Sequence, residues 1–68
     1  MSIQIQLNGD PCPLPLPITV QALLGVLSLD PRAVAVEVNK VVVRRTSYED
    51  RVINDGDEVE IVAFVGGG

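Results

Sequence analysis

Residues 55–68 read DGDEVEIVAFVGGG, and this stretch decides the fold that the sequence predicts. Its first three residues are typical of a turn, and apolar residues then alternate with others over Glu58 to Val65, the period of a half-buried strand. The residues expected to face the core are Val59, Ile61, Ala63 and Val65. This last strand reaches the centre of a sheet only by lying beside the strand that begins the chain.

The first strand is expected near the start of the chain. Apolar residues at positions 3, 5 and 7 alternate with glutamines, and Asn8-Gly9 supplies the positive φ angles of a hairpin turn. Residues 11–17 then read PCPLPLP. Because N–H groups of an extended strand point alternately to its two edges, prolines at every second position remove donors from one edge only. We predict an edge strand with Cys12, Leu14 and Leu16 on one face; a polyproline linker is the alternative.

One helix and a second hairpin are expected next. Thr19 is a candidate N-cap before apolar residues at helical spacing, and Pro31 predicts an end near Asp30, which gives about ten residues. Valines at 34, 36 and 38 and the segment 41–44 predict two strands around Asn39-Lys40. Residues 46–54 are polar and are expected to form a loop with room for one capped helical turn.

The order strand, strand, helix, strand, strand, strand predicts an α+β domain of the β-grasp (ubiquitin-like) type. It requires a mixed sheet of four to five strands with one helix packed on one face. We expect this domain to cover residues 1–65 and to be followed by a flexible glycine tail at 66–68.

Composition excludes several classes of function. The 68 residues carry five basic and nine acidic side chains and a net charge of −4, so nucleic acid is an improbable partner. Without histidine and with Cys12 as the one cysteine, the chain cannot build a Ser-His-Asp triad, a disulfide or an iron–sulfur site from its own side chains. We expect no bound cofactor or metal. With neither a basic leader nor an apolar run long enough to span a membrane, the expected location is the cytoplasm.

Three features have an ordinary structural explanation beside a functional one. The acidic residues 55–58 suggest a calcium loop, but Arg51 and Ile53 stand where ligands are needed, so a simple turn is favoured. Cys12 is expected to be packed rather than reactive, because no cation lies near it in sequence. Arg44-Arg45 is either solvated or in contact with a phosphate or an acidic partner.

Val62 and Phe64 are expected on the outer face of the last strand, turned away from the core. A large exposed apolar side chain in a chain with two aromatic residues suggests a docking patch, although single exposed apolar residues need no explanation.

The three glycines at positions 66–68 are the second candidate site. Taken alone they are typical of a frayed tail, but directly after a buried strand they would present a carboxylate on a thin arm that enters a narrow channel in a partner. A carboxylate is a poor electrophile, so the expected chemistry is activation by ATP to an acyl-adenylate, followed by attack of a nucleophile. The enzyme would be the partner.

Three segments carry a resemblance to a known family: Val36 to Asn39, Asn54 to Val59, and Val65 to Gly68. Together with the predicted fold they resemble the ThiS family of sulfur carriers in thiamine biosynthesis, across essentially the whole chain. The resemblance implies a carrier protein and not an enzyme.

The family's double glycine corresponds to Gly67 and Gly68, and Gly66 is an additional tail position. The resemblance implies that Gly68 is adenylated by a ThiF-type enzyme at the expense of ATP and becomes a thiocarboxylate. A persulfide protein would donate the sulfur, thiazole synthase would receive it, and Gly66, Phe64 and Val62 would contact the partners.

Two departures from the family pattern are the proline-alternating strand and Lys40 in place of a turn glycine. The small subunit of molybdopterin synthase is the nearest alternative; such chains carry a proline pair where this one has Ala63-Phe64-Val65. A non-covalent β-grasp module with an inert tail and a ubiquitin-like modifier joined to lysines are further alternatives.

Overall fold

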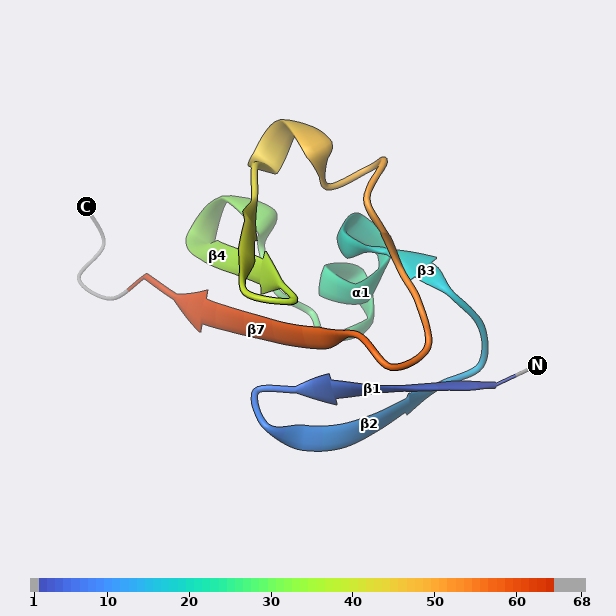
Figure 1. Ribbon diagram of the computed structural model, residues 1–68. Coiled ribbons are helices and arrows are strands. Elements are labelled where there is room, and N and C mark those ends of the chain that lie inside the picture. The colour runs from blue at the N-terminus through green and yellow to red at the C-terminus, as the bar shows by residue number, and fades with distance from the viewer. Residues whose placement is uncertain (1, 65–68) are drawn as a thin grey trace.

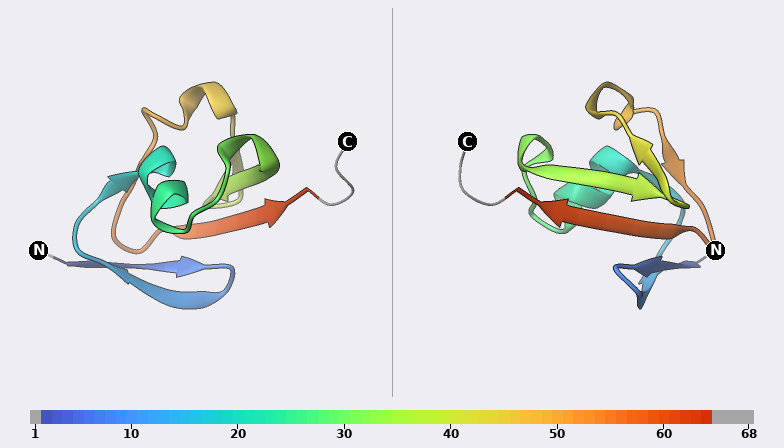
Figure 2. Two further views of the ribbon diagram at one scale, coloured as in Figure 1. Left: turned by 180° about the vertical axis from the view of Figure 1, so that it is seen from behind. Right: turned by 60° about the vertical axis from the view of Figure 1, so that its left-hand side comes forward.

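A five-stranded mixed sheet with one helix on one of its faces makes up the fold (Figures 1 and 2). The computed structural model describes residues 2–64 of the chain. The strand order is β2-β1-β7-β4-β5, and β1 and β7 are parallel whereas the other neighbours are antiparallel. The elements are β1 (Ile3–Leu7), β2 (Asp10–Leu14), α1 (Val20–Val26), β4 (Val34–Val38), β5 (Val41–Val43) and β7 (Glu58–Ala63). The predicted placing of the last strand beside the first is confirmed.

The first hairpin has the predicted turn and the predicted edge strand. Asn8 and Gly9 have φ angles of 50° and 86°, as a two-residue type I′ turn requires. Pro11 and Pro13 of β2 stand opposite Gln6 and Gln4 of β1, and no strand of the described residues lies on the other side of β2. The prolines therefore lie on the open edge, and a polyproline linker is ruled out.

The prediction that Cys12, Leu14 and Leu16 share one face of the strand holds for Cys12 and Leu14 and is wrong for Leu16. Leu14 is buried and Cys12 is half-buried against the core, so the cysteine is packed as predicted. Leu16 is 55% exposed. The reason is that β2 ends at Leu14, and the following residues leave the sheet to run towards the helix.

The helix begins where predicted and ends earlier. The Thr19 hydroxyl accepts a hydrogen bond from the N–H of Ala22 at 3.1 Å, which confirms the N-cap. Ser28 adopts a positive φ of 58°, its N–H donates to Gly25, and the N–H of Leu29 donates to Leu24. This pair of bonds is a Schellman motif, which closes the last turn after Val26 and not near Asp30 as expected.

Asp30 instead caps a short 3-10 turn, η1 (Pro31–Ala33). Its carboxylate accepts the backbone N–H of Arg32 at 2.9 Å and also contacts the Arg32 guanidinium. These hydrogen bonds stabilise the charged form, so the pKa of Asp30 lies below its usual value and that of Arg32 above.

The region expected to be a loop with room for one capped helical turn contains such a turn, without a side-chain cap, and a short strand that was not predicted. It forms a 3-10 turn, η2 (Arg45–Ser47), and a short strand, β6 (Val52–Ile53), which pairs antiparallel with β3 (Ile18–Thr19) in a separate two-stranded sheet. The N–H of Val20 donates to Arg51, and that of Gln21 donates to Tyr48, so the segment is fastened to the start of α1. Both strands have two residues, too few to show any periodicity.

The core fills the space between the sheet and α1. Its buried residues are Ile3, Ile5, Leu14, Val20, Leu23, Leu24, Val34, Val36, Val38, Val43, Tyr48, Ile53 and Val59. On β7, Val59 is buried and Ile61 half-buried as expected, but Ala63 is exposed, which corrects its predicted place in the core. β7 extends past the end of β1, beyond the layer that α1 covers (Figure 1). Val65 lies outside the described residues.

The second hairpin turns on two residues with positive φ, Asn39 at 52° and Lys40 at 68°. Lys40→Gly is expected to raise the free energy of unfolding by about 0.5–1 kcal/mol. The left-handed conformation costs an ordinary residue about 1–2 kcal/mol, and the greater chain entropy of glycine cancels roughly half of that gain. Urea denaturation measures the change. Arg44→Gly is the matched control, because Arg44 has a φ of −71° and a glycine there should destabilise; equal effects of both substitutions would contradict the explanation.

Among the described residues no helix is long and apolar enough to cross a membrane.

Candidate functional site

The candidate site lies at the end of β7. This half of the strand is paired along one side with β4, where Val62 stands opposite Ala35 and Ala63 opposite Val34. The N–H of Phe64 continues the ladder by donating to the carbonyl of Ala33 at 2.9 Å. The backbone is therefore held in place as far as Phe64.

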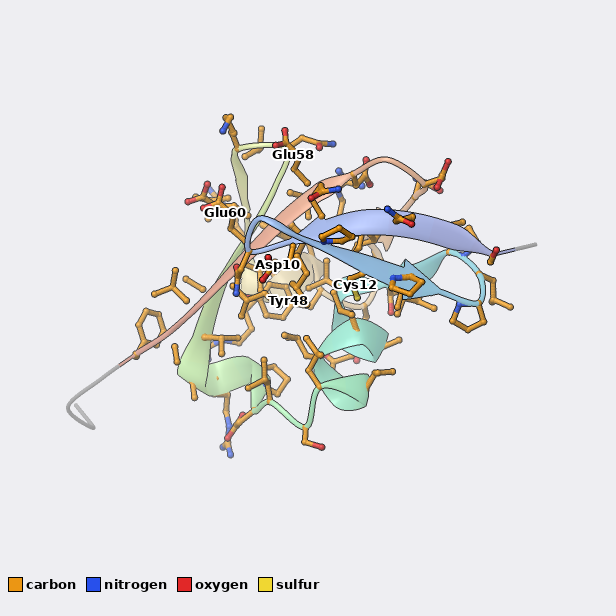
Figure 3. The ribbon with its side chains drawn as sticks, turned by 90° about the horizontal axis from the view of Figure 1, so that it is seen from below. Asp10, Cys12, Tyr48, Glu58 and Glu60 are labelled. Carbon is orange, nitrogen blue, oxygen red and sulfur yellow. The ribbon has the colours of Figure 1, made fainter. Side chains whose placement is uncertain are left out.

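Val62 and Phe64 are 62% and 61% exposed, so the exposure predicted for both side chains is confirmed. They follow Glu58 and Glu60 at the alternate positions of β7 whose side chains lie outside the core. Figure 3 shows Glu58 and Glu60 on the side of the sheet away from α1. On β7, the two exposed apolar residues thus follow two glutamates along the same outer face.

Two asparagines fasten β7 to its neighbours, a role that the sequence does not predict. Asn8 Oδ1 accepts the N–H of Ile61 at 2.8 Å, and Asn39 Oδ1 accepts the N–H of Glu58 at 2.9 Å. Each asparagine lies in a hairpin turn, directly after the last residue of a strand that neighbours β7. Its side-chain oxygen accepts a backbone N–H of β7 beyond the end of that strand. Asparagine at the first position of each turn was visible in the sequence, but its partner on β7 was not.

The carboxylates of Asp55 and Asp57, in the turn before β7, accept hydrogen bonds from other residues of the chain. Asp55 Oδ1 accepts the N–H of Gln4 at 2.8 Å, and Asp57 Oδ2 accepts the N–H of Asn54, also at 2.8 Å. Asp57 Oδ1 accepts from the Asn39 amide. These hydrogen bonds are typical of a structural turn, and this turn holds the beginning of β7 in place. Residues 2–64 contain no cluster of metal-ligating side chains.

Gly66, Gly67 and Gly68 lie outside the described residues, so their predicted role stays a prediction. Arg44 and Arg45 are exposed, directly after β5 and in η2, and β4 lies between β5 and β7. The structure does not bring them into one site with the end of β7.

Residues 5–68 match the ThiS family. The chain belongs to the ThiS family. A sulfur carrier protein ThiS from Bacillus subtilis is 42% identical over 50 residues, which cover 74% of this chain and 76% of the relative. The crystal structure of a thiamine biosynthesis protein (ThiS) from Geobacter metallireducens superimposes with a TM-score of 0.85 at 32% identity, over 97% of this chain and all of the other. The predicted family and its ubiquitin-like β-grasp fold are confirmed.

A longer protein contains the same domain. A thiazole synthase from Paramagnetospirillum magneticum is 47% identical over 66 residues, which are 97% of this chain but only 20% of that protein. The chain thus spans about a fifth of this relative. The ThiS family match includes Val62, Phe64 and the three glycines.

Proposed function

We propose that this ThiS-family chain is a sulfur carrier for thiazole formation in thiamine biosynthesis and acts as a co-substrate, not as a catalyst. The family match from residue 5 to Gly68 carries the proposal. The name of the Bacillus subtilis relative and the presence of a similar segment in a thiazole synthase support the same pathway. We place this activity in the cytoplasm, where ATP is available.

The proposed chemistry takes place on the carboxylate of Gly68. In the active site of a ThiF-type enzyme, this carboxylate attacks the α-phosphorus of ATP and pyrophosphate leaves. The terminal sulfur of a persulfide protein then attacks the acyl carbon, AMP leaves, and a thiol reduces the acyl disulfide to the thiocarboxylate. The sulfur finally passes to the substrate of thiazole synthase. The chain itself needs no cofactor for these steps.

The glycines suit this role because they have no side chains. A narrow channel that admits Gly66, Gly67 and Gly68 would exclude a branched or aromatic residue at the same positions. In our proposal the docking contact comes from the outer face at the end of β7, where Val62 and Phe64 are exposed. Because the backbone is hydrogen-bonded as far as Phe64, a partner that binds this face also sets the direction in which the tail starts.

Reconstitution tests the proposal. The chain is incubated with a ThiF-type enzyme, Mg-ATP and a persulfide donor, and its intact mass is measured. We expect the gain that corresponds to replacement of one oxygen by sulfur, and alkylation should trap the new group as a thioester.

The matched control omits ATP and should leave the mass unchanged. An unmodified chain, in an assay where an established ThiS protein is modified, would overturn the proposal. Transfer of the bound sulfur to a molybdopterin precursor rather than to the thiazole would assign the carrier to the alternative pathway.

A further inference from the structure

The basic residues of this acidic chain are gathered in one segment. Four of its five Lys and Arg side chains lie within residues 40–51: Lys40, Arg44, Arg45 and Arg51. With Glu49 and Asp50 included, the segment has a net charge of 4 − 2 = +2, whereas the other residues carry 1 − 7 = −6, which together give −4. The segment forms the hairpin turn, β5 and η2, so most of the basic residues of the chain lie in this part of the fold.

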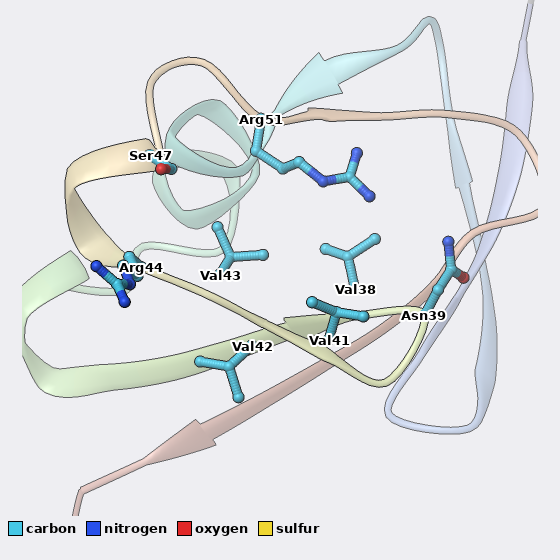
Figure 4. A pocket seen from close by; sticks show the side chains of 8 residues that line it. All are labelled: Val38, Asn39, Val41, Val42, Val43, Arg44, Ser47 and Arg51. Atoms are coloured by element: carbon cyan, nitrogen blue, oxygen red, sulfur yellow. The ribbon is translucent and has the colours of Figure 1, made fainter.

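A hollow of about 350 Å³ opens on this side (Figure 4). It is lined by Val38, Asn39, Val41, Val42, Val43, Arg44, Ser47 and Arg51, with no carboxylate among them. Figure 4 shows Val43 between Arg44 and Arg51, Val38 and Val41 below Arg51, and Val42 on the other side of β5. Val38 and Val43 are buried and belong to the core, whereas Val41 is 67% exposed. The hollow therefore offers an apolar surface between two cations.

The hollow adjoins an open edge of the sheet. β5 has β4 as its one neighbour among the described residues. The two-residue turn makes Val38 and Val41 a hydrogen-bonded pair, so Val42, opposite Glu37, occupies a non-hydrogen-bonded position. The N–H and C=O of Val42 then point to the open edge. Prolines block the opposite edge, at β2, but no proline protects β5.

The two arginines that line the hollow keep guanidinium N–H donors that are not used within the described residues. Within residues 2–64 the one ion pair joins Arg32 to Asp30, far along the chain from β5. Arg51 donates one guanidinium N–H to the carbonyl of Val52. A guanidinium has five N–H donors, so Arg51 retains capacity for a carboxylate, and Arg44 is exposed.

We infer that this β5–η2 surface, formed by the residues that line the hollow, docks an extended acidic segment of a partner protein. The segment pairs with Val42 at the edge, inserts an apolar side chain over Val38 and Val41, and presents carboxylates to Arg44 and Arg51. A second copy of this chain is a poor occupant, because it would bring the same cations together. The inference does not depend on sulfur transfer, since neither Val62 nor Phe64 is among the residues that line the hollow.

Two synthetic peptides test the inference, one alternating valine with glutamate and one alternating valine with lysine. Each is titrated into the ¹⁵N-labelled chain. We expect the glutamate peptide alone to shift the amide resonances of Val41–Val43, Ser47 and Arg51. Its affinity should fall at least about tenfold between roughly 50 mM and 500 mM salt, because exposed charges are screened.

Charge reversal provides the matched comparison. Arg44→Glu with Arg51→Glu should abolish the shifts, whereas Arg32→Glu, the same change of charge per site outside the surface, should leave them unchanged. The spectra of the free variants show whether each is folded, and glutamine replaces glutamate at either position where folding is lost. Equal binding of the lysine peptide, shifts confined to the Val62 and Phe64 side, or no shifts at all would overturn the inference, whatever the outcome of the sulfur-transfer assay.

Discussion

Deletion of Gly68 is expected to reduce sulfur loading of the chain below detection while the domain remains folded. The reacting carboxylate must reach the α-phosphorus of ATP in the partner, and misplacement by the length of one residue, about 3.5 Å, prevents in-line attack. Every buried core residue of the described structure lies between Ile3 and Val59, so we expect the free energy of unfolding to change by less than about 0.5 kcal/mol. Intact-mass analysis and urea denaturation measure the two quantities.

A one-residue extension after Gly68 is the matched variant, because it displaces the carboxylate in the opposite direction. Gly67→Leu keeps the length and adds a side chain, and it should also stop loading by obstructing the channel. Ser2→Ala, an exposed change at the far end of the chain, should leave loading unaffected. A shortened chain that is loaded at the normal rate would show that the tail is inert, as in a non-covalent β-grasp module.

Phe64→Ala is expected to weaken binding to the adenylating enzyme about tenfold to a hundredfold. Burial of an aromatic side chain at the centre of an interface is worth roughly 1.5–3 kcal/mol, which corresponds to this range of affinity. The ring is 61% exposed in the free chain, so its removal should change stability little. Calorimetric titration and thermal denaturation measure the two effects.

Val26→Ala is the control for that experiment. Val26 is 69% exposed, but it lies on α1, on the opposite side of the sheet from the proposed docking face. Its truncation removes exposed apolar area without touching that face, so binding should stay the same. Equal losses for both variants, or unfolding of the Phe64 variant, would contradict docking through the end of β7.

Local features of the sequence predicted much of the fold. Asn8-Gly9 predicted a turn, Thr19 predicted the helix start, and the prolines of β2 predicted an edge strand; the structure confirms each. All three depend on a residue's own backbone preferences or on contacts a few residues away, such as the bond from Ala22 to Thr19. Such preferences can be read without knowledge of the rest of the molecule.

The same applies to part of the candidate site. Alternation along β7 predicted that Val62 and Phe64 face outward, because successive side chains of a strand always point to opposite faces. The same alternation placed Ala63 in the core, and this prediction was wrong. Whether an inward position is covered depends on how far α1 and β1 extend, and those elements end before the last residues of β7.

Contacts between distant residues were decided by the tertiary structure alone. The two-residue strands β3 and β6 have no pattern of their own and exist because Ile18 meets Ile53. The hollow beside β5 likewise exists only because the chain after η2 turns back and brings Arg51 next to the hairpin of β4 and β5. Backbone preferences and alternation, which the sequence determines by itself, act over a few residues. The β3–β6 ladder, the exposure of Ala63 and the grouping of Arg44 with Arg51 depend on chain closure, which becomes favourable only when the whole core packs.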